Sequence, residues 1–112
     1  MYSKELLKGT LNIIILKLLA HNGKMYGYEI TQRVKVLSQD KIQIKEGSLY
    51  PSLHKLKDEG LVKTEEEMIG NRVRKYYSLT EKGKLSTKEK DNELQQYMGT
   101  LQNIILNQSP AS

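Results

Sequence analysis

The chain has 112 residues, of which 38% are hydrophobic and 28% charged, and it contains no Phe, Trp or Cys. This length fits one small domain, and the missing cysteines exclude disulfides and thiolate metal sites. The formal net charge of +5 favours an anionic partner. The excess of Lys and Arg lies within residues 1–80, whereas residues 81–112 hold 4 basic and 4 acidic residues. This division predicts a nucleic-acid-facing first part and a last part with another role.

The sequence gives little support to an enzyme or to a membrane protein. The first residues lack a signal-peptide pattern, and no apolar run reaches the ~18 residues that a membrane-spanning helix needs. Only His21 and His54 are present, without a Gly-rich phosphate loop or metal-ligand spacing. We therefore expect a cytoplasmic protein that is not an enzyme and has no cofactor or metal.

Residues 6–20 predict a first helix that is apolar nearly all round. One stripe recurs at three- and four-residue steps: Leu7, Leu11, Ile14 and Leu18. Such a helix needs contacts on more than one side, so a second subunit is expected to cover part of it. Because Gly9 and Thr10 weaken its start, we expect it to begin near Thr10 or after a short preceding turn.

A second helix is expected within residues 25–38, where helical spacing resumes after a stop signal at 21–23. Its apolar face comprises Ile30, Val34 and Leu37. Gly27 lies near its start, where close approach of the first helix would explain the missing side chain. A polar, extended segment then leads to a third helix.

The third helix, within residues 45–60, carries the pattern most suited to DNA. One side is apolar and consists of Leu49, Leu53 and Leu56. The other side is polar and partly basic, with Tyr50 on its flank: Ser48, His54, Lys55 and Asp58. Such a helix suits a DNA major groove, although an ordinary amphipathic helix with a solvated face has the same pattern. Three short consecutive helices in this order predict a helix-turn-helix.

The ends of this third helix are also marked in the sequence. Gly60 is placed to end it, because glycine adopts a left-handed backbone at little cost. Pro51 is tolerable if it lies in the first turn, where backbone N–H groups lack intrahelical partners. The helix is therefore expected to begin within residues 46–48, with Gly47 or Ser48 near the cap.

Residues 61–69 and 72–80 predict a β-hairpin around Gly70-Asn71, because both segments are rich in Val, Thr, Tyr and Ile. The tip is cationic, with Arg72, Arg74 and Lys75. A hairpin after a helix-turn-helix is a wing, and these cations are expected to reach phosphates or a minor groove. A solvated hairpin end would be charged as well. The acidic run 65–67 must point away from DNA or lie beyond its reach.

A last helix is expected from a cap at Thr80 to about Asn107. Its second half carries a coiled-coil-like stripe that needs a partner: Leu94, Tyr97, Met98, Leu101, Ile104 and Ile105. The predicted fold is therefore mainly α with a small β-hairpin. It comprises a winged helix-turn-helix at 1–80, a dimerisation helix at 81–107 and a disordered tail at 108–112.

A slot between the first and last helices of two subunits could accept a flat apolar molecule. The candidate residues for this slot, or for simple packing of the dimer interface, are Leu11, Asn12, Ile15, Leu94, Tyr97, Met98, Leu101 and Ile105. Both interpretations remain open at the level of sequence.

Several blocks of the chain resemble the PadR family of transcriptional regulators in their order and spacing. They are YGYEI at 26–30, GSLYPSLHKL at 47–56, EGLV at 59–62 and RKYYSLT at 74–80, followed by Gly83. The resemblance covers roughly residues 6–106 and is strongest to the short branch with a single C-terminal helix. The LYP and KYYxLT blocks are specific when they occur together.

The resemblance implies a winged helix-turn-helix homodimer that binds a double-stranded DNA operator, usually as a repressor. In the family, the C-terminal helix of one subunit packs with the first and C-terminal helices of the other. Many members release DNA on binding a small aromatic or cationic compound. Carried over by position, Tyr50 and Lys55 would touch DNA from the third helix, and the wing would contribute Arg72, Arg74 and Lys75. Ser48 and His54 are expected to read bases beside them. The alternative is a winged-helix module that binds protein partners and never touches DNA.

Overall fold

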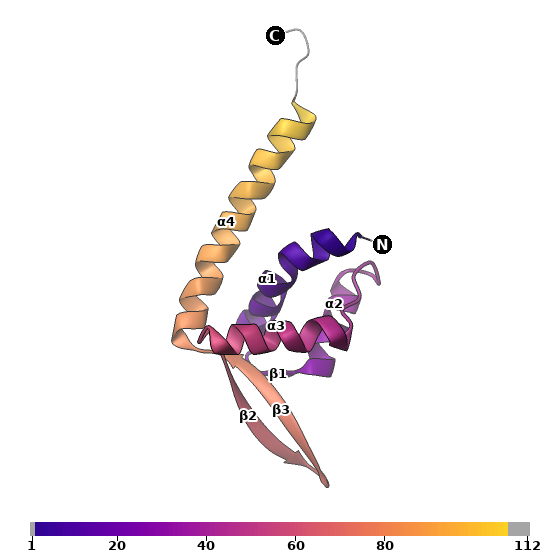
Figure 1. The fold of residues 1–112 in the computed structure, drawn as a ribbon, viewed down its shortest axis with the longest axis vertical. Helices are drawn as coiled ribbons and strands as arrows, with labels where there is room; N and C mark the ends of the chain where they lie inside the picture. The colour runs from indigo at the N-terminus through magenta and orange to yellow at the C-terminus, as the bar shows by residue number, and fades with distance from the viewer. Residues whose placement is uncertain (1, 108–112) are drawn as a thin grey trace.

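The structure is a computed structural model that describes residues 2–107, so the tail predicted at 108–112 lies outside the described residues. Its elements are α1 (Lys4–Asn22), β1 (Met25–Tyr26), α2 (Gly27–Leu37), α3 (Glu46–Asp58), β2 (Val62–Ile69), β3 (Arg72–Leu79) and α4 (Glu81–Leu106). The first three helices, β1 and the adjoining ends of β2 and β3 form a head. The rest of the β2–β3 hairpin and α4 extend from this head in different directions (Figure 1). The prediction of a mainly helical fold with a small β-hairpin is confirmed.

Helix α1 begins earlier than the sequence predicted. The Ser3 hydroxyl accepts a hydrogen bond from the Leu6 amide at 3.4 Å and caps the helix ahead of Gly9, which therefore lies inside it. The predicted start near Thr10 is wrong, because this cap offsets the low helix propensity of Gly9. The residues that α1 buries form a broad arc: Leu11, Ile15, Leu16, Leu18 and Leu19.

The head is built on the leucine side of α3. Leu49, Leu53 and Leu56 are fully buried, and they belong to one core cluster with α1 and α2 residues such as Leu16 and Ile30. Burial of each such side chain stabilises the fold by roughly 1.5–3 kcal/mol. The apolar spacing therefore predicted correctly which side of α3 faces inward.

Helix α3 begins at Glu46, within the predicted range 46–48, but its cap is not the expected Gly47 or Ser48. Lys45 is the N-cap, since the amides of Ser48 and Leu49 both donate to its carbonyl. Pro51 is thus the sixth helical residue, in the second turn rather than the first. Proline lacks an N–H, so the carbonyl of Gly47 loses its i+4 partner. Gly47 is exposed, and water can bind that carbonyl.

Gly60 ends α3 as predicted, with φ +77°. The Leu61 amide donates to the Leu56 carbonyl and the Gly60 amide donates to the Lys57 carbonyl, both at 2.9 Å. These two bonds form a Schellman motif, which satisfies carbonyls at the helix end and directs the chain into β2.

The hairpin also forms where it was predicted, around a two-residue turn in which Gly70 has φ +61°. The sheet has the order β1-β3-β2, because the two residues of β1 pair with Tyr76 and Tyr77. Strand β1 escaped prediction, since two residues are too few to show an alternating pattern.

A compact junction fixes the start of α4 to the end of α3. The Thr80 hydroxyl accepts a hydrogen bond from the Gly83 amide at 2.9 Å, as the predicted cap requires, and donates to the Gly60 carbonyl at 2.6 Å. The Thr80 amide donates to the Leu61 carbonyl at 3.1 Å. A Cβ at Gly83 would overlap that carbonyl, lying 2.9 Å from its carbon. Only glycine lets the two segments approach this closely.

Farther along, α4 packs against α1 and then leaves the head. Lys17 Nζ lies 2.9 Å from Asp91 Oδ2, and this ammonium lowers the pKa of the Asp91 carboxyl. Beyond Leu94 the apolar side chains of α4, including Tyr97, are exposed. None of the helices within residues 2–107 is long and apolar enough to span a membrane.

Gly83→Ala should destabilise the protein, because the added methyl group has no room against Leu61. We expect a loss of about 1–3 kcal/mol, the usual cost of overpacking, seen as a lower melting temperature. Gly99→Ala is the matched control in the same helix, where a Cβ meets open space. It should leave stability unchanged or raise it by up to about 1 kcal/mol through helix propensity. Equal melting temperatures for both variants would contradict the junction described here.

Candidate nucleic-acid interface

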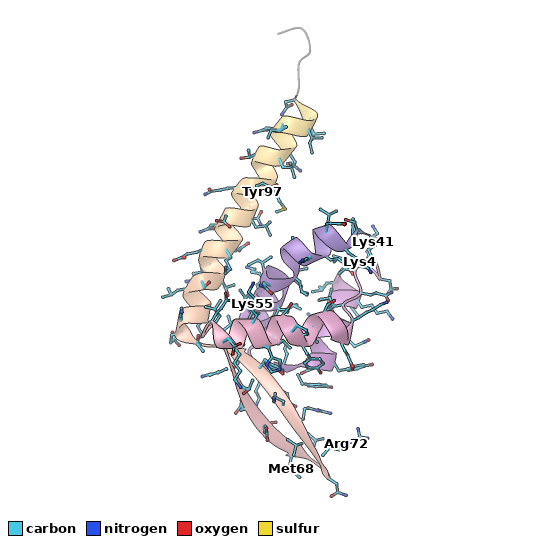
Figure 2. The ribbon with its side chains drawn as sticks, viewed as in Figure 1. Lys4, Lys41, Lys55, Met68, Arg72 and Tyr97 are labelled. Carbon is cyan, nitrogen blue, oxygen red and sulfur yellow. The ribbon has the colours of Figure 1, made fainter. Side chains whose placement is uncertain are left out.

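The polar face of α3 is exposed, as its spacing predicted. Ser48, Tyr50, His54 and Lys55 are all accessible, whereas the leucines on the opposite side are buried. Figure 2 shows Lys55 on α3 and Arg72 at the far end of the hairpin. The cations predicted to contact DNA are therefore carried by two separate elements.

A hollow of about 530 Å³ lies between α3, the start of α2 and β3. It brings together five of the seven predicted DNA-binding residues: Tyr50, His54, Arg72, Arg74 and Lys75. Ser48 and Lys55 do not line it. Tyr26 and Tyr28, which the sequence analysis did not select, do. Their place in the YGYEI block next to Gly27 was the only available signal. The result is a recess that is both aromatic and cationic.

The register of the hairpin divides its charged residues between two faces. Cross-strand partners share a face of the sheet. We call the face on which Tyr77 is buried the inner face, and it carries the pairs Thr64–Tyr77 and Glu66–Lys75. The alternate pairs, which include Glu67–Arg74 and Ile69–Arg72, lie on the outer face. Lys75 therefore lies on the inner face of the wing and Arg72 and Arg74 on its outer face, although all three line the hollow.

Two residues of the acidic run, Glu65 and Glu67, share one lysine as an ion-pair partner on the outer face. Lys24, which precedes β1, forms ion pairs with Glu67 and, at 3.4 Å, with Glu65. The hydrogen bond that Lys24 donates to the Glu67 carboxylate raises the pKa of Lys24. The Lys24 ammonium also lies 5.0 Å from the centroid of the Tyr76 ring. Glu66 is on the inner face, opposite Lys75. The run 65–67 thus presents no single acidic surface.

Arg74 is engaged by tyrosines at the base of the wing. Its guanidinium carbon lies 4.0 Å from the centroid of the Tyr26 ring, and its Nη1 donates to the Tyr76 hydroxyl at 3.5 Å. The two rings meet edge-to-face, with centroids 5.6 Å apart. Arg74 therefore holds the wing against β1, whereas Arg72 and Lys75 are the exposed cations of β3.

Tyr50 is fixed by the glycine at the start of α2. A Cβ at Gly27 would lie 2.9 Å from Cζ of Tyr50 and closer still to its hydroxyl. The sequence analysis attributed this glycine to close approach of the first helix, which is wrong, because the neighbour is the Tyr50 ring of α3. Burial, with a smaller effect of Tyr50, raises the pKa of Tyr77 behind the ring.

The residues predicted for a slot between subunits fall into three groups by their burial. Leu11 is almost fully buried and Ile15 is 0% exposed, so both belong to the core of the head and not to a surface that a partner could reach. Asn12 and Leu94 are half-buried. The remaining residues on α4 are exposed: Tyr97, Met98, Leu101 and Ile105.

An apolar groove of about 450 Å³ lies between α1, α2 and the middle of α4, which it meets at Asp91, Leu94 and Gln95. Its apolar lining includes Ile13, Ile14 and Leu18 of α1, Val34 and Leu37 of α2, and Leu94 of α4. The sequence analysis missed Ile13 as a groove residue, because α1 is apolar on nearly all sides and its spacing alone does not show which side stays open. Within residues 2–107 no group of three or more His, Asp or Glu side chains is placed to hold a metal ion.

The sequence model of the transcriptional regulator PadR-like family matches residues 15–89. The chain belongs to this family. The resemblance found from its residues is thereby confirmed, as is the expectation that it is not an enzyme, because PadR-family proteins are transcription regulators.

Individual PadR relatives agree in sequence and in fold. A transcriptional regulator of Mycobacterium tuberculosis is 30% identical over 77 residues, which are 69% of this chain and 69% of the relative. The structure of a transcriptional regulator from Clostridium thermocellum has a TM-score of 0.83 at 28% identity, covering 92% of this chain and 97% of that one. Bacillus subtilis PadR, solved in complex with operator DNA, has a TM-score of 0.64 at 34% identity, covering 70% of this chain and 45% of the other.

Gly27→Ala should destabilise the PadR-family head only while Tyr50 is present. We expect a thermodynamic coupling of about 0.5–3 kcal/mol between Gly27→Ala and Tyr50→Ala, measured by a double-mutant cycle in urea. Gly9→Ala, where a Cβ meets open space, should be additive with Tyr50→Ala. Additivity of Gly27→Ala as well would show that the ring does not rest on this glycine.

Proposed function

We propose that this PadR-family protein is a homodimeric, sequence-specific DNA-binding repressor that a small molecule releases from its operator. One observation carries the proposal: Tyr50 and His54 of α3 and the cations of β3 converge on one hollow. The Bacillus subtilis relative solved in complex with operator DNA supports it. The cytoplasmic location expected from the sequence belongs to the same proposal, because a regulator must share a compartment with its operator.

In this proposal α3 enters the major groove with its exposed face. Ser48, His54 and Lys55 offer hydrogen-bonding groups to base edges, whose donor and acceptor pattern differs for each base pair. Tyr50 contributes a hydroxyl from a ring that packs against Gly27. An ordered side chain loses less conformational entropy on binding.

The wing holds the sugar-phosphate backbone next to that groove. Lys75 lies on the inner face of the hairpin and Arg72 at its end, so a strand crossing the hollow passes between α3 and two cations. Contacts to phosphates fix orientation without reading sequence. Arg74 contributes indirectly, since its stacking on Tyr26 sets the position of the wing.

The homodimer would form along α4. Its distal half exposes an apolar stripe beside the apolar groove lined by α1 and α2, and a second copy of α4 would cover both. Such coverage removes apolar area from water and supplies the main driving force of association. The two α3 helices would then occupy successive major grooves about 34 Å apart.

The effector would bind where the two copies meet. Tyr97 and Met98 offer an aromatic face and a polarisable thioether, which suit a flat aromatic or cationic compound. The adjoining groove is mainly apolar, as small-molecule sites usually are. Occupation of this site would change the angle between the two α4 helices and so the spacing of the heads.

Binding of duplex DNA by the full-length protein tests the DNA-binding part. Duplexes are first selected from a random pool, and affinity is then measured by anisotropy at several salt concentrations. Each phosphate contact should add about −0.9 to the slope of log K against log salt concentration. Lys75→Ala should reduce this slope, and Lys55→Ala should weaken binding by about 1–3 kcal/mol and relax base preference.

Lys90→Ala is the matched control, because Lys90 is an exposed lysine on α4 and belongs neither to α3 nor to the wing. It should change neither affinity nor slope. Failure of the wild-type protein to enrich any duplex would favour the alternative, a winged-helix module for protein partners.

Leu101→Glu should convert the dimer into a monomer, because it places a charge in the apolar stripe of α4. Burial of an unpaired carboxylate is strongly unfavourable. Leu85→Glu is the matched control on the proximal half of the same helix, where Leu85 is exposed and outside the stripe. Sedimentation velocity should show a dimer for the wild type and for Leu85→Glu only. A monomeric wild-type protein would overturn the dimer proposal.

A further inference from the structure

The end of the wing is apolar on both of its faces. Three apolar side chains are exposed there: Met68 by 65%, Ile69 by 42% and Val73 by 59%. Met68 pairs with Val73 on the inner face, and Ile69 pairs with Arg72 on the outer face. We call these three apolar residues the wing tip. Figure 2 shows Met68 and Arg72 at the end of the hairpin away from α4.

Nothing in the described fold requires apolar residues at the wing tip. Strand β1 pairs with β3 only at Tyr76 and Tyr77, so within residues 2–107 the sheet beyond them has two strands and no covering element. Thr, Lys or Arg would suit such a solvated hairpin end equally well. Contiguous exposed apolar residues mark surfaces that contact a partner.

The surroundings of the wing tip indicate which partner it meets. Ile69 and Val73 line the same hollow as His54 of α3. Arg72 adds a cation at the tip, and the nearest acidic side chains on the two faces are opposed by Lys75 or paired with Lys24. An apolar surface with a cation, continuous with the polar face of α3, suits nucleic acid rather than a second copy of the chain.

We propose that the wing tip enters the minor groove beside the site of α3 and selects A·T pairs there by excluding guanine. This inference rests on the proposed DNA-binding function. The minor groove is about 6 Å wide, so a hairpin end inside it touches both walls, and both of its faces are best apolar. Arg72 would lie in the negative potential of a narrow A·T-rich groove.

Exclusion follows from the chemistry of the groove floor. A·T and T·A pairs present only acceptors in the minor groove, whereas G·C adds the guanine N2 amino donor. Met68 and Val73 have no strong acceptor for this donor, so covering it would leave it without a hydrogen bond, which is unfavourable. The tip therefore discriminates without a direct hydrogen bond to a base.

The test uses the full-length protein and a duplex selected from a random pool with the wild type. Each A·T pair flanking the half-sites is replaced in turn by G·C and by inosine·C. Inosine lacks the 2-amino group, so its pair with C resembles G·C in the major groove and A·T in the minor groove. For the wild type we expect G·C to weaken binding about tenfold at one or two flanking pairs, with inosine·C restoring it to within about twofold.

The variant Met68→Thr/Val73→Thr should bind with less than about threefold discrimination between G·C and inosine·C, because Thr can accept a hydrogen bond. Its salt slope should match that of the wild type, since no charge is removed. Val36→Thr is the matched control, as Val36 is exposed on α2 and does not line the hollow. It should discriminate like the wild type.

Each other outcome overturns the inference. Equal weakening by G·C and inosine·C would place the contact in the major groove, and no weakening at any flanking pair would exclude a minor-groove contact. Unchanged discrimination in Met68→Thr/Val73→Thr would assign the preference to Arg72 or to DNA shape. If the wild type selects no duplex, or binds without salt dependence, the proposed function itself fails, which is a distinguishable result.

Discussion

The structure depends on a close approach between the end of α3 and the start of α4. The Thr80 hydroxyl bonds to both the Gly60 carbonyl and the Gly83 amide, and the Leu61 carbonyl occupies the space that a side chain at Gly83 would need. Helix α3 carries the polar face of the candidate interface, and α4 carries the exposed apolar stripe. Their relative orientation is therefore set by this junction together with the packing of α4 against α1, which includes the Lys17–Asp91 ion pair.

In the wing, the charged residue Arg74 fixes the position of the hairpin and is not one of its exposed cations. Arg72, Arg74 and Lys75 are near neighbours in the sequence, but only Arg74 stacks on Tyr26 and bonds to Tyr76. Lys24 engages the acidic side chains of the outer face in the same way. The network joins the hairpin to β1 and hence to the start of α2. Because exposed ion pairs contribute little stability, its value lies in fixing the direction of the wing.

Gly27 allows close packing between two helices of the head. At Gly27 the absent side chain lets the Tyr50 ring lie against α2, so the helix that precedes the turn holds a residue on the polar face of α3. The same ring contributes to the raised pKa of Tyr77 on β3. Gly27 of α2, Tyr50 of α3 and Tyr77 of β3 also line the same hollow, so two helices and the sheet meet around one aromatic residue. Preorganisation of this kind lowers the entropic cost of binding to a rigid partner such as duplex DNA.

The sequence by itself determined the helices, the hairpin and the PadR family. Apolar spacing placed Leu53 inward and Lys55 outward, and Gly60, Gly70 and Thr80 marked the ends of elements. These are local signals, fixed by backbone geometry and by burial of one helix face. Only the tertiary structure decided what depends on distant contacts: that Ile15 faces the core, that Arg74 is occupied by a tyrosine, and that β1 exists. Such features arise from segments far apart in the chain, and no local spacing encodes which of several apolar or charged residues will find a partner.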